Sequence, residues 1–516
     1  MKKRIPFYEM GTLALGLLLS ILSAAICMQI MGQFGIAPNT SLISAVLVMV
    51  VARIPLVVVS RFRNLERQNY VLSVASSAGF AAANCGFVAI ATMFVLGQNG
   101  LVIPMAFGTL IGSFISVFVT GRIFDSRIFP AKGAWPLGVA VATSLEAGDK
   151  GGKKGFELLQ GLAIGVVASI FGVPAAGVGI VFIANMFTMS ALGVGMILRG
   201  HSIRLFGGFD IGQSNIAQGV MIGAGIVALV QIFLAITKGS KNTTCDEFSV
   251  NDRMALKTML GAVGLFIVGA IVIALVTGIW GEMGVGLASL WVVFASICAI
   301  ISMVLVGTAS MHSGWAPTFA VVTICLTVGV FIGFPPMPLA VLVGYIGSVG
   351  PCFADTGIGL KAGWLLRGSG TSLQHELYGR KQQVLIKQLG VVIGIAMAVF
   401  FGTTLVRSDV LPPMSIFYAY TVETVMDSVV LQELFLWAIP GAVLQAAFGS
   451  KSVGLMLAAG LLINNAVFGI AVLSAIVLRL VIGTKHMTVR APGLIAGDGL
   501  FGFVNNIFRV FLGNVV

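Results

Sequence analysis

Two aspartates in apolar, glycine-containing stretches are the side chains of this sequence best suited to chemistry. Asp355 lies in residues 350–357 (GPCFADTG), and Asp498 lies in residues 491–499 (APGLIAGDG). A carboxylate in apolar surroundings is costly unless it is paired, hydrated or protonated. Such a group can take up and release a proton as its surroundings change. We therefore expect proton coupling at Asp355 and Asp498, each in a break between helical segments.

Structural roles are the alternatives for both acids. Asp355 and the threonine after it suit the N-cap of a helix that begins two residues later, because their side chains accept hydrogen bonds from free backbone N–H groups. Asp498 could instead pair with Arg479 or Arg490. His312 ranks third for proton coupling, because imidazole changes charge near neutral pH, although a hydrogen-bonded histidine in a loop is the simpler interpretation.

Polar side chains in similar stretches indicate a path for a solute. Residues 68–77 (QNYVLSVASS) and residues 135–148 also interrupt apolar sequence. Polar groups at membrane depth persist only where protein or a water-filled cavity satisfies them. The residues that we expect to line or border this path are Asn69, Ser73, Ser76, Ser77, Thr143, Asp355, Thr356 and Asp498.

Composition decides the class of protein in which these groups lie. Of 516 residues, 58% are hydrophobic and only 9% are charged. Soluble proteins carry about 25% charged residues, and a single soluble core cannot bury so much apolar surface. The mean hydropathy is +1.05. A soluble enzyme, a nucleic-acid binder and a disordered scaffold are therefore excluded, and a polytopic membrane protein remains.

Apolar stretches of the roughly 20 residues needed to cross a bilayer recur along the chain. We expect an all-α polytopic membrane protein with about 14 to 16 transmembrane helices, including re-entrant or broken segments. The 66 glycines indicate closely packed helices. Two short stretches, 135–147 and 415–426, could span the membrane, re-enter it or lie at its surface.

Basic residues set the expected orientation. Lys2, Lys3 and Arg4 precede the first apolar stretch. Basic residues also follow the second and the fourth stretch: Arg61, Arg63, Arg67, Arg122, Arg127 and Lys132. The positive-inside rule places such segments in the cytoplasm. We expect a multi-pass protein of the cytoplasmic (inner) membrane with a cytoplasmic N-terminus. The same rule explains the net charge of +12 without a nucleic-acid partner.

The chain divides into two halves that resemble each other. We expect an N-terminal transmembrane half (1–237), a polar connecting loop (238–254) and a C-terminal transmembrane half (255–516). Residues 144–165 and 359–394 each combine an xLxAG turn, a basic loop and a helix with a GxxxG spacing. These two segments should superpose if the halves arose by duplication. Duplicated halves with a site between them are typical of transporters.

The GxxxG glycines of these two segments carry their own expectation. Gly161 and Gly165 in the first half, and Gly390 and Gly394 in the second, should contact neighbouring helices closely. A glycine that faced lipid would tolerate a larger side chain at the same position.

Signatures of soluble or metal-dependent enzymes are missing from the sequence. It has no HExxH or GxSxG motif, and residues 148–154 (GDKGGKK) lack the GK[ST] ending of a phosphate loop. The six cysteines form no CxxC pair, so neither a disulfide framework nor a zinc site is indicated. We predict no cofactor, no bound metal and no enzymatic activity. A membrane-embedded enzyme acting on lipid or peptide bonds is the alternative of a different class.

Four stretches together make the chain resemble the oligopeptide transporter superfamily, in particular its yellow-stripe-like and bacterial branch. Residues 68–77 are similar to the family segment NNIVQTIASA, and residues 135–148 to YPEGTACAEVLKAG. Residues 354–366, followed by RKQQ at 380–383, are similar to GDTSQDLKTGYLLG…RKQQ. Residues 493–500 (GLIAGDGL) are similar to SGLIAGEALMG.

The sequence departs from the family pattern at three path positions. Leu72 replaces a glutamine, and Leu137 and Thr143 replace two glutamates. These differences remove polar groups from the expected path, so they affect the substrate and the coupling chemistry rather than the fold.

The resemblance implies a secondary active, proton-coupled symporter for small peptides or peptide-like metal chelates. The alternative within transport is an exporter or carrier of another amphipathic solute. The expected partners are the substrate, protons and the lipid bilayer, and a homodimer is compatible with the sequence. The identity of the substrate, the coupling ion and the direction of transport stay open at this point.

Overall fold

The computed structural model describes residues 6, 8–34, 40–53, 64–150, 152–237, 248–313, 316–424, 428–448, 453–484, 487 and 489–512. Five of the basic residues used for the orientation, Lys2, Lys3, Arg4, Arg61 and Arg63, lie outside them, as does most of the predicted connecting loop. The expected N-terminal orientation therefore stays a prediction.

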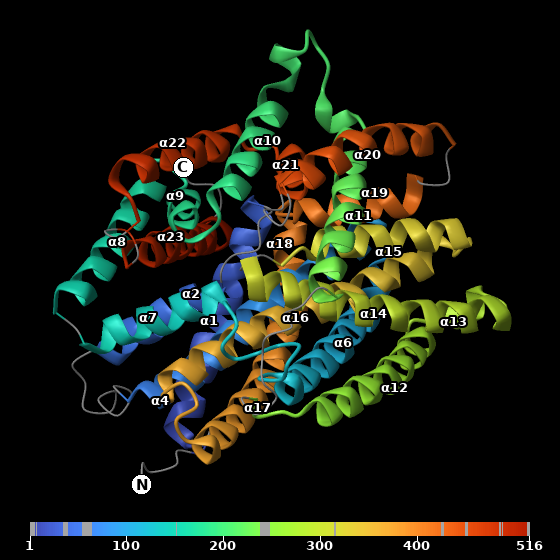
Figure 1. The fold of residues 1–516 in the computed structure, drawn as a ribbon. Helices are drawn as coiled ribbons and strands as arrows, with labels where there is room; N and C mark the ends of the chain where they lie inside the picture. The colour runs from blue at the N-terminus through green and yellow to red at the C-terminus, as the bar shows by residue number, and fades with distance from the viewer. Residues whose placement is uncertain are drawn as a thin grey trace.

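The described part of the chain consists of helices joined by turns and loops and contains no strand, which confirms an all-α polytopic fold (Figure 1). The helices of the first part are α1 (Met10–Phe34), α2 (Thr40–Arg53), α4 (Leu65–Phe80), the π-helix η2 (Ala81–Phe87), α5 (Val88–Val95), α6 (Val102–Ile123), α7 (Pro136–Lys150), α8 (Gly152–Ile170), α9 (Ala175–Ile183), α10 (Met186–Leu205), the 3₁₀ turn η4 (Ile211–Gln213) and α11 (Ile216–Thr237).

The second part continues the same architecture. Its helices are α12 (Asp252–Val276), α13 (Ile279–Glu282), α14 (Val285–Ser313), α15 (Thr318–Ile332), α16 (Pro336–Leu366), α17 (Leu373–Met397), the π-helix η6 (Ala398–Gly402), α18 (Thr403–Arg407), α19 (Pro413–Thr424), α20 (Ser428–Phe448), α21 (Val453–Leu462), α22 (Ala466–Ile482) and α23 (Arg490–Leu512). The two ambiguous short stretches of the sequence form the short helices α7 and α19.

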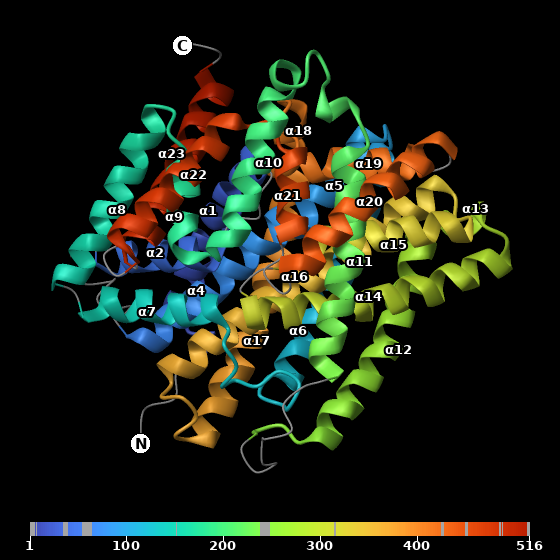
Figure 2. The same cartoon turned by 45° about the horizontal axis from the view of Figure 1, so that its top comes forward.

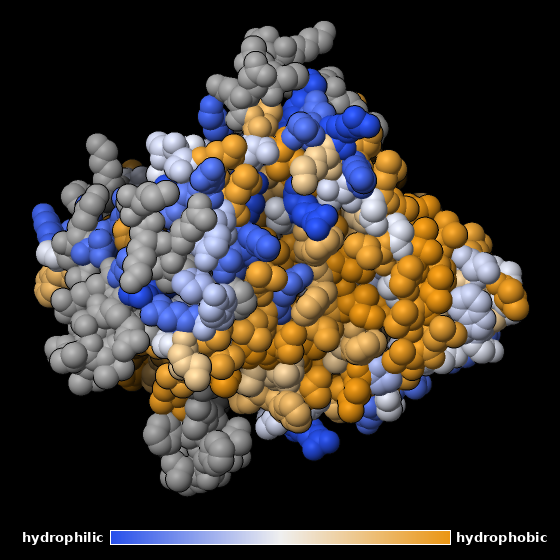
Figure 3. Space-filling view, turned by 90° about the horizontal axis from the view of Figure 1, so that it is seen from below, coloured by the Kyte–Doolittle hydropathy of each residue, from blue (hydrophilic) through white to orange (hydrophobic). Residues whose placement is uncertain are grey.

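Several of these helices are suited to a bilayer. Seven helical segments among the described residues are long and apolar enough to cross a membrane, and five shorter apolar helices accompany them. On α12, the side chains of Leu256, Leu260, Val268 and Leu275 are each about 60% exposed. Figure 3 shows a broad apolar area on the surface. An apolar surface of this kind is stable against lipid rather than water.

Helix α16 lies in the middle of the molecule (Figure 1) and packs against α4, α6, α7, α14 and α15. Almost every residue from Pro338 to Trp364 is buried. A helix that is apolar all round and enclosed by other helices is a core helix. Its polar side chains therefore face protein rather than lipid, which is what makes Asp355 informative.

The break expected at residues 350–357 is wrong, because α16 runs through them without interruption. Pro351 has no N–H to donate within the helix. Neighbouring helices donate to carbonyls in the turn before it: Ser302 Oγ to Ile346 O at 3.1 Å, Cys85 Sγ to Ser348 O at 3.8 Å and Ser116 Oγ to Val349 O at 2.6 Å. Side chains that satisfy the backbone in this way allow proline inside a membrane helix.

The other expected breaks are also helical. Residues 68–77 lie within α4, and the helix continues into the wider turns of η2. Residues 491–499 lie within α23, where Pro492 falls in the first turn and costs no hydrogen bond. Asp355 is thus in the interior of a helix, so the N-cap interpretation is wrong as well.

The glycine faces contact neighbouring helices closely, and these contacts join the two parts of the chain. A Cβ on Gly165 of α8 would lie 2.5 Å from Leu494 O of α23, and a Cβ on Gly161 would lie still closer to the Arg490 carbonyl. A Cβ on Gly390 of α17 would lie 2.5 Å from Val74 O of α4. Figure 2 shows α8 and α9 side by side with α22 and α23. The expectation of close contact at these glycines is confirmed.

Segments 144–165 and 359–394 share the order of their parts. The first contains the end of α7 and most of α8, and the second contains the end of α16 and most of α17. Each is therefore a helix end followed by a second helix. Their superposition, and with it the duplication, stays a prediction.

Candidate functional site

Asp355 lies at the centre of a buried polar cluster formed by four helices. Its Oδ2 accepts a hydrogen bond from Lys387 Nζ of α17 at 2.5 Å. Its Oδ1 accepts from Ser76 Oγ of α4 at 2.6 Å and from Ser41 Oγ of α2 at 3.1 Å. Three donors on one carboxylate match the acceptor capacity of an ionised aspartate. The geometry is that of a charged pair with both oxygens satisfied.

The Lys387 side chain reaches this carboxylate because α16 carries a glycine opposite it. A Cβ on Gly359 would lie 2.6 Å from Lys387 Cε, so a larger residue would push the lysine aside. Lys387 is fully buried, and Ser77 Oγ donates to its backbone carbonyl at 2.8 Å. Removing either partner of such a pair would leave a buried charge without compensation.

One helical turn before Lys387, Gln383 continues the polar cluster. Its Nε2 donates to Ser73 Oγ and to Gly359 O, each at 3.0 Å, and lies 3.4 Å from Asn69 Oδ1. Its Oε1 accepts from Arg367 Nη1 at 2.7 Å. Gln383 therefore links the serine-rich face of α4 to the end of α16.

A second ionic group closes the cluster where α16 meets α17. Arg367 donates to both oxygens of Glu376, at 2.7 and 3.0 Å. Arg380 Nε lies 3.5 Å from Glu376, and its Nη2 lies 3.7 Å from Asp125. A bidentate arginine–carboxylate pair has a fixed geometry. This group holds the α16–α17 connection in place beneath the Asp355 pair.

Asp498 lies in a different environment, on α23 where it packs against α8 and α9. Its Oδ1 accepts from Ser169 Oγ in a very short hydrogen bond, and its Oδ2 accepts from the backbone N–H of Ala176 at 2.6 Å. Ala176 is in the first turn of α9, where backbone N–H groups lack helical partners and favour an anion.

The alternative of an ion pair between Asp498 and Arg479 or Arg490 is wrong, because the partners of Asp498 are a hydroxyl and a backbone amide. Arg479 instead donates to the carbonyls of Val181 and Ala184. Arg490 lies 3.8 Å from Glu157. The Asp498 carboxylate is therefore stabilised by the positive end of α9 rather than by a basic side chain.

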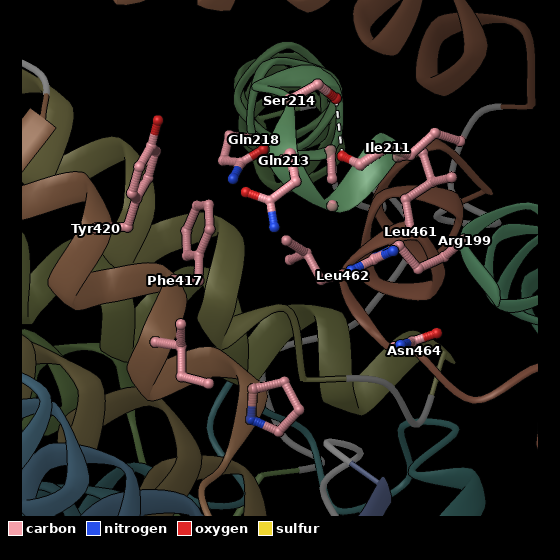
Figure 4. A pocket seen from close by; sticks show the side chains of 14 residues that line it. Arg199, Ile211, Gln213, Ser214, Gln218, Phe417, Tyr420, Leu461, Leu462 and Asn464 are labelled. Atoms are coloured by element: carbon pink, nitrogen blue, oxygen red, sulfur yellow. Dashed lines mark hydrogen bonds between the residues drawn. The ribbon is translucent and has the colours of Figure 1, made fainter. Parts of the chain in front are cut away.

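A pocket of about 440 Å³ lies elsewhere, between the end of α10, the start of α11 and helices α19 and α21 (Figure 4). It combines one guanidinium, several neutral polar groups and an apolar wall. Its lining residues are Arg199, Ile211, Gly212, Gln213, Ser214, Ala217, Gln218, Pro413, Ile416, Phe417, Tyr420, Leu461, Leu462 and Asn464. The residues predicted for the solute path are not among them.

The comparison with protein families indicates a class of membrane protein that agrees with this helical fold and its buried polar groups. Residues 11–239 match the family model described as OPT oligopeptide transporter protein. These residues are an oligopeptide transporter domain. No curated protein matches the chain. The predicted family is thereby confirmed over residues 11–239, and the yellow-stripe-like and bacterial branch stays a prediction.

The oligopeptide transporter family is a family of membrane transporters and not of enzymes, so residues 11–239 belong to a transporter domain, and the apolar helices agree with a multi-pass membrane protein. The matched residues contain Ser41 and Ser76, whereas Asp355 and Lys387 lie beyond them. The Asp355 cluster thus joins the matched domain to the rest of the transporter.

Most of the path residues predicted from the sequence come together in this transporter. Asn69, Ser73, Ser76, Ser77, Asp355 and Thr356 are all buried between α4, α16 and α17. The hydroxyl of Thr356 has no hydrogen-bond partner among the described residues. A role of these six residues in translocation stays a prediction.

Three predicted residues lie apart from the Asp355 cluster. Asp498 is on α23, as described, and Thr143 is exposed on α7. His312 lies in the last turn of α14, so its expected loop position is wrong, and its side chain lies outside the described part of the structure.

Sequence reasoning missed Lys387, Gln383 and Ser41. Gln383 and Lys387 are spaced i, i+4, and only Gln388 separates the lysine from a long apolar run. This spacing indicates a shared helix face, but the basic residues around 380 favour a loop when the sequence is considered alone. The structure places them within α17, which begins at Leu373.

Proposed function

We propose that this transporter accumulates small peptides or peptide-like metal chelates by coupling their uptake to protons across the cytoplasmic membrane. The observation that carries the proposal is the Asp355–Lys387 pair, with 2.5 Å between Lys387 Nζ and Asp355 Oδ2 in a fully buried setting. The peptide class follows from the matched family, and the coupling follows from the chemistry of the pair.

A buried ion pair is a two-state element because it is stable only while both partners are charged. Protonation of Asp355 would leave Lys387 without its counter-ion in an interior where an unpaired charge is costly. The hydroxyl donors Ser41 and Ser76 come from α2 and α4, whereas the pair belongs to α16 and α17. A change in the protonation of Asp355 therefore alters contacts between the two parts of the chain.

Asp498 is a second acid with the same potential. It is buried, and its two partners come from α8 and α9. Its protonation would weaken the contact of α23 with these helices. We propose that both Asp355 and Asp498 take part in proton coupling. We also propose that the N-terminus lies on the cytoplasmic side of the membrane.

Transport in proteoliposomes tests the proposal. The charge-neutral variant Asp355→Asn/Lys387→Met removes the titratable pair without leaving a lone buried charge. We expect it to lose accumulation driven by an imposed pH gradient and to retain counterflow of the same substrate. Glu282→Gln is the matched control, because Glu282 is an exposed acid on α13. Accumulation at the parental rate by the double variant would contradict proton coupling through this pair.

A further inference from the structure

The pocket between α10, α11, α19 and α21 has the size of a site for a small solute. Its volume of about 440 Å³ falls within the roughly 300–1,000 Å³ of ligand pockets. Ligand sites combine an apolar lining with a few convergent polar groups. This pocket is likewise lined by apolar side chains together with a few polar ones (Figure 4).

Arg199 is the charged group of the pocket, and only part of its guanidinium is occupied. Its Nη1 donates to Asp210 Oδ1 at 2.6 Å. Its other N–H groups contact no acceptor among the described residues. Asp210 is itself fixed by the backbone N–H of Gly212 at 2.9 Å. The acid therefore orients the guanidinium and leaves donors for a second anion.

Gly212 allows the guanidinium to take this position. A Cβ on Gly212 would overlap Arg199 Nη2, so any larger residue would displace the guanidinium. The side chain of Arg199 is 17% exposed, which is enough for a solute to reach it from the pocket.

Neutral amides lie beside the arginine. Gln213, Gln218 and Asn464 line the pocket, and Figure 4 shows Gln213 and Gln218 turned toward its interior. The Oε1 atom of Gln218 is buried and has no hydrogen-bond partner among the described residues. A buried acceptor without a donor costs free energy unless a ligand or water supplies the donor. Amide donors and acceptors of this kind match a peptide group.

The opposite wall is apolar and held in place. Phe417 and Tyr420 of α19 form this wall, and Leu461 and Leu462 line the pocket next to Arg199 (Figure 4). The hydroxyl of Tyr420 donates to Asn215 Oδ1 at 2.9 Å, so its ring is fixed by the start of α11. Aromatic rings provide a large apolar contact area with a defined geometry.

We propose that this pocket binds a small peptide-like solute by its carboxylate, with Arg199 as the carboxylate receptor and the Phe417–Tyr420 wall receiving an apolar side chain. The solute class rests on the proposed function. A carboxylate is the matching group because the guanidinium is planar, keeps its charge and binds carboxylates with two parallel hydrogen bonds. The amides of Gln213 and Gln218 then meet the peptide bond.

Binding measurements on the purified full-length protein test the site. The probes are the dipeptide Ala-Leu and the same dipeptide with a C-terminal amide, which differ only in the carboxylate. We expect Ala-Leu to bind at least roughly tenfold more tightly than the amide, since charge-assisted hydrogen bonds are lost with the carboxylate. Arg199→Gln should abolish this preference.

Two further variants separate the role of the arginine from folding. Gly212→Ala keeps the charge but displaces the guanidinium, so it should also reduce the preference for the carboxylate. Arg204→Gln changes another arginine of α10, which is exposed and does not line the pocket, and should bind Ala-Leu like the parent protein. Equal affinity of the parent for both probes, no binding of Ala-Leu, or an unchanged preference in Arg199→Gln would overturn the proposal.

The proposal of a binding site in the pocket and the proposal of proton coupling through Asp355 and Lys387 can be refuted independently. The variant Asp355→Asn/Lys387→Met leaves the pocket residues unchanged, so it should bind Ala-Leu with parental affinity while it fails to accumulate it. If this variant binds Ala-Leu normally and also accumulates it, the coupling proposal is wrong and the pocket stands. If it loses the preference for the carboxylate, the pocket is not an independent site and the proposal is overturned.

Discussion

At the scale of residues, the Asp355 carboxylate depends on donors that come from three other helices. Lys387 supplies the charge, and Ser41 and Ser76 supply hydroxyl groups. Buried charges are tolerated when they are paired and fully hydrogen-bonded. The cluster therefore combines a stabilising role with the capacity to respond to a proton.

Removing only the lysine should be worse than removing both charges. Lys387→Met leaves Asp355 without its counter-ion, which we expect to cost about 3–5 kcal/mol of stability. The double variant Asp355→Asn/Lys387→Met should recover most of this loss. Thermal unfolding of the detergent-solubilised proteins provides the comparison, and a double variant less stable than Lys387→Met would refute the pairing.

Ser76→Ala should cost about 1.5–3 kcal/mol, because its hydroxyl donates to a charged oxygen at 2.6 Å. Ser20→Ala is a matched control. Ser20 is also buried in a membrane helix, but its hydroxyl has no hydrogen-bond partner among the described residues. Melting curves should therefore show a larger loss of stability for Ser76→Ala than for Ser20→Ala. Equal losses would mean that the hydrogen bond to Asp355 contributes nothing to stability.

Single residues could be predicted from the sequence where polarity stood out against apolar neighbours. Asp355, Ser76 and Asp498 were recognised in this way. Lys387 was not, because its partner lies 32 residues earlier and only the packing of α17 on α16 brings the two together. Arg199 gave no signal either, since an arginine near the end of an apolar helix is common.

At the scale of elements, the course of α16 could not be predicted from its own residues. Gly350 and Pro351 favour a break locally, and the sequence was interpreted accordingly. Ser302, Cys85 and Ser116 satisfy carbonyls near the proline, and all three are far away in the sequence. Tertiary contacts therefore override a local preference for a break.

The glycine faces were predictable because GxxxG spacing places two small residues on one side of a helix. Gly390→Leu should prevent α17 from packing on α4, since a Cβ alone would lie 2.5 Å from Val74 O. We expect loss of the folded protein or of transport. Gly264→Leu is the control, because a Cβ at Gly264 meets nothing within 4 Å on exposed α12. Size-exclusion profiles and transport rates report the difference, and a functional Gly390→Leu variant would contradict the packing.

At the scale of the whole molecule, Asp355 and Asp498 each lie where helices of the first and second parts of the chain meet, but in different groups of helices. Asp355 joins α16 to α2, α4 and α17, and Asp498 joins α23 to α8 and α9. Both contacts run between the first and second parts of the chain. The polytopic fold and the family could be predicted from composition and motifs, whereas this cross-connection depends on long-range packing.

Asp498→Asn, and Asp355→Asn combined with Lys387→Met, should each abolish accumulation driven by a pH gradient while leaving substrate exchange measurable. An asparagine keeps the shape of the side chain but cannot carry the charge that coupling requires. Gradient-driven uptake and counterflow in the same proteoliposomes distinguish the two activities. Parental accumulation by both variants would exclude these acids and direct attention to a sodium gradient or to His312.

The pairing of α8 with α23 has a consequence for how the protein is made. Ser169 and Asp498 are separated by 329 residues, so α8 leaves the ribosome long before its partner exists. Until then, the close-packing face around Gly161 and Gly165 has no helix to cover it. Biogenesis must therefore hold α8 in the bilayer as an unfinished element, protected by lipid or by an insertion chaperone, and the late arrival of α23 completes the first part of the molecule.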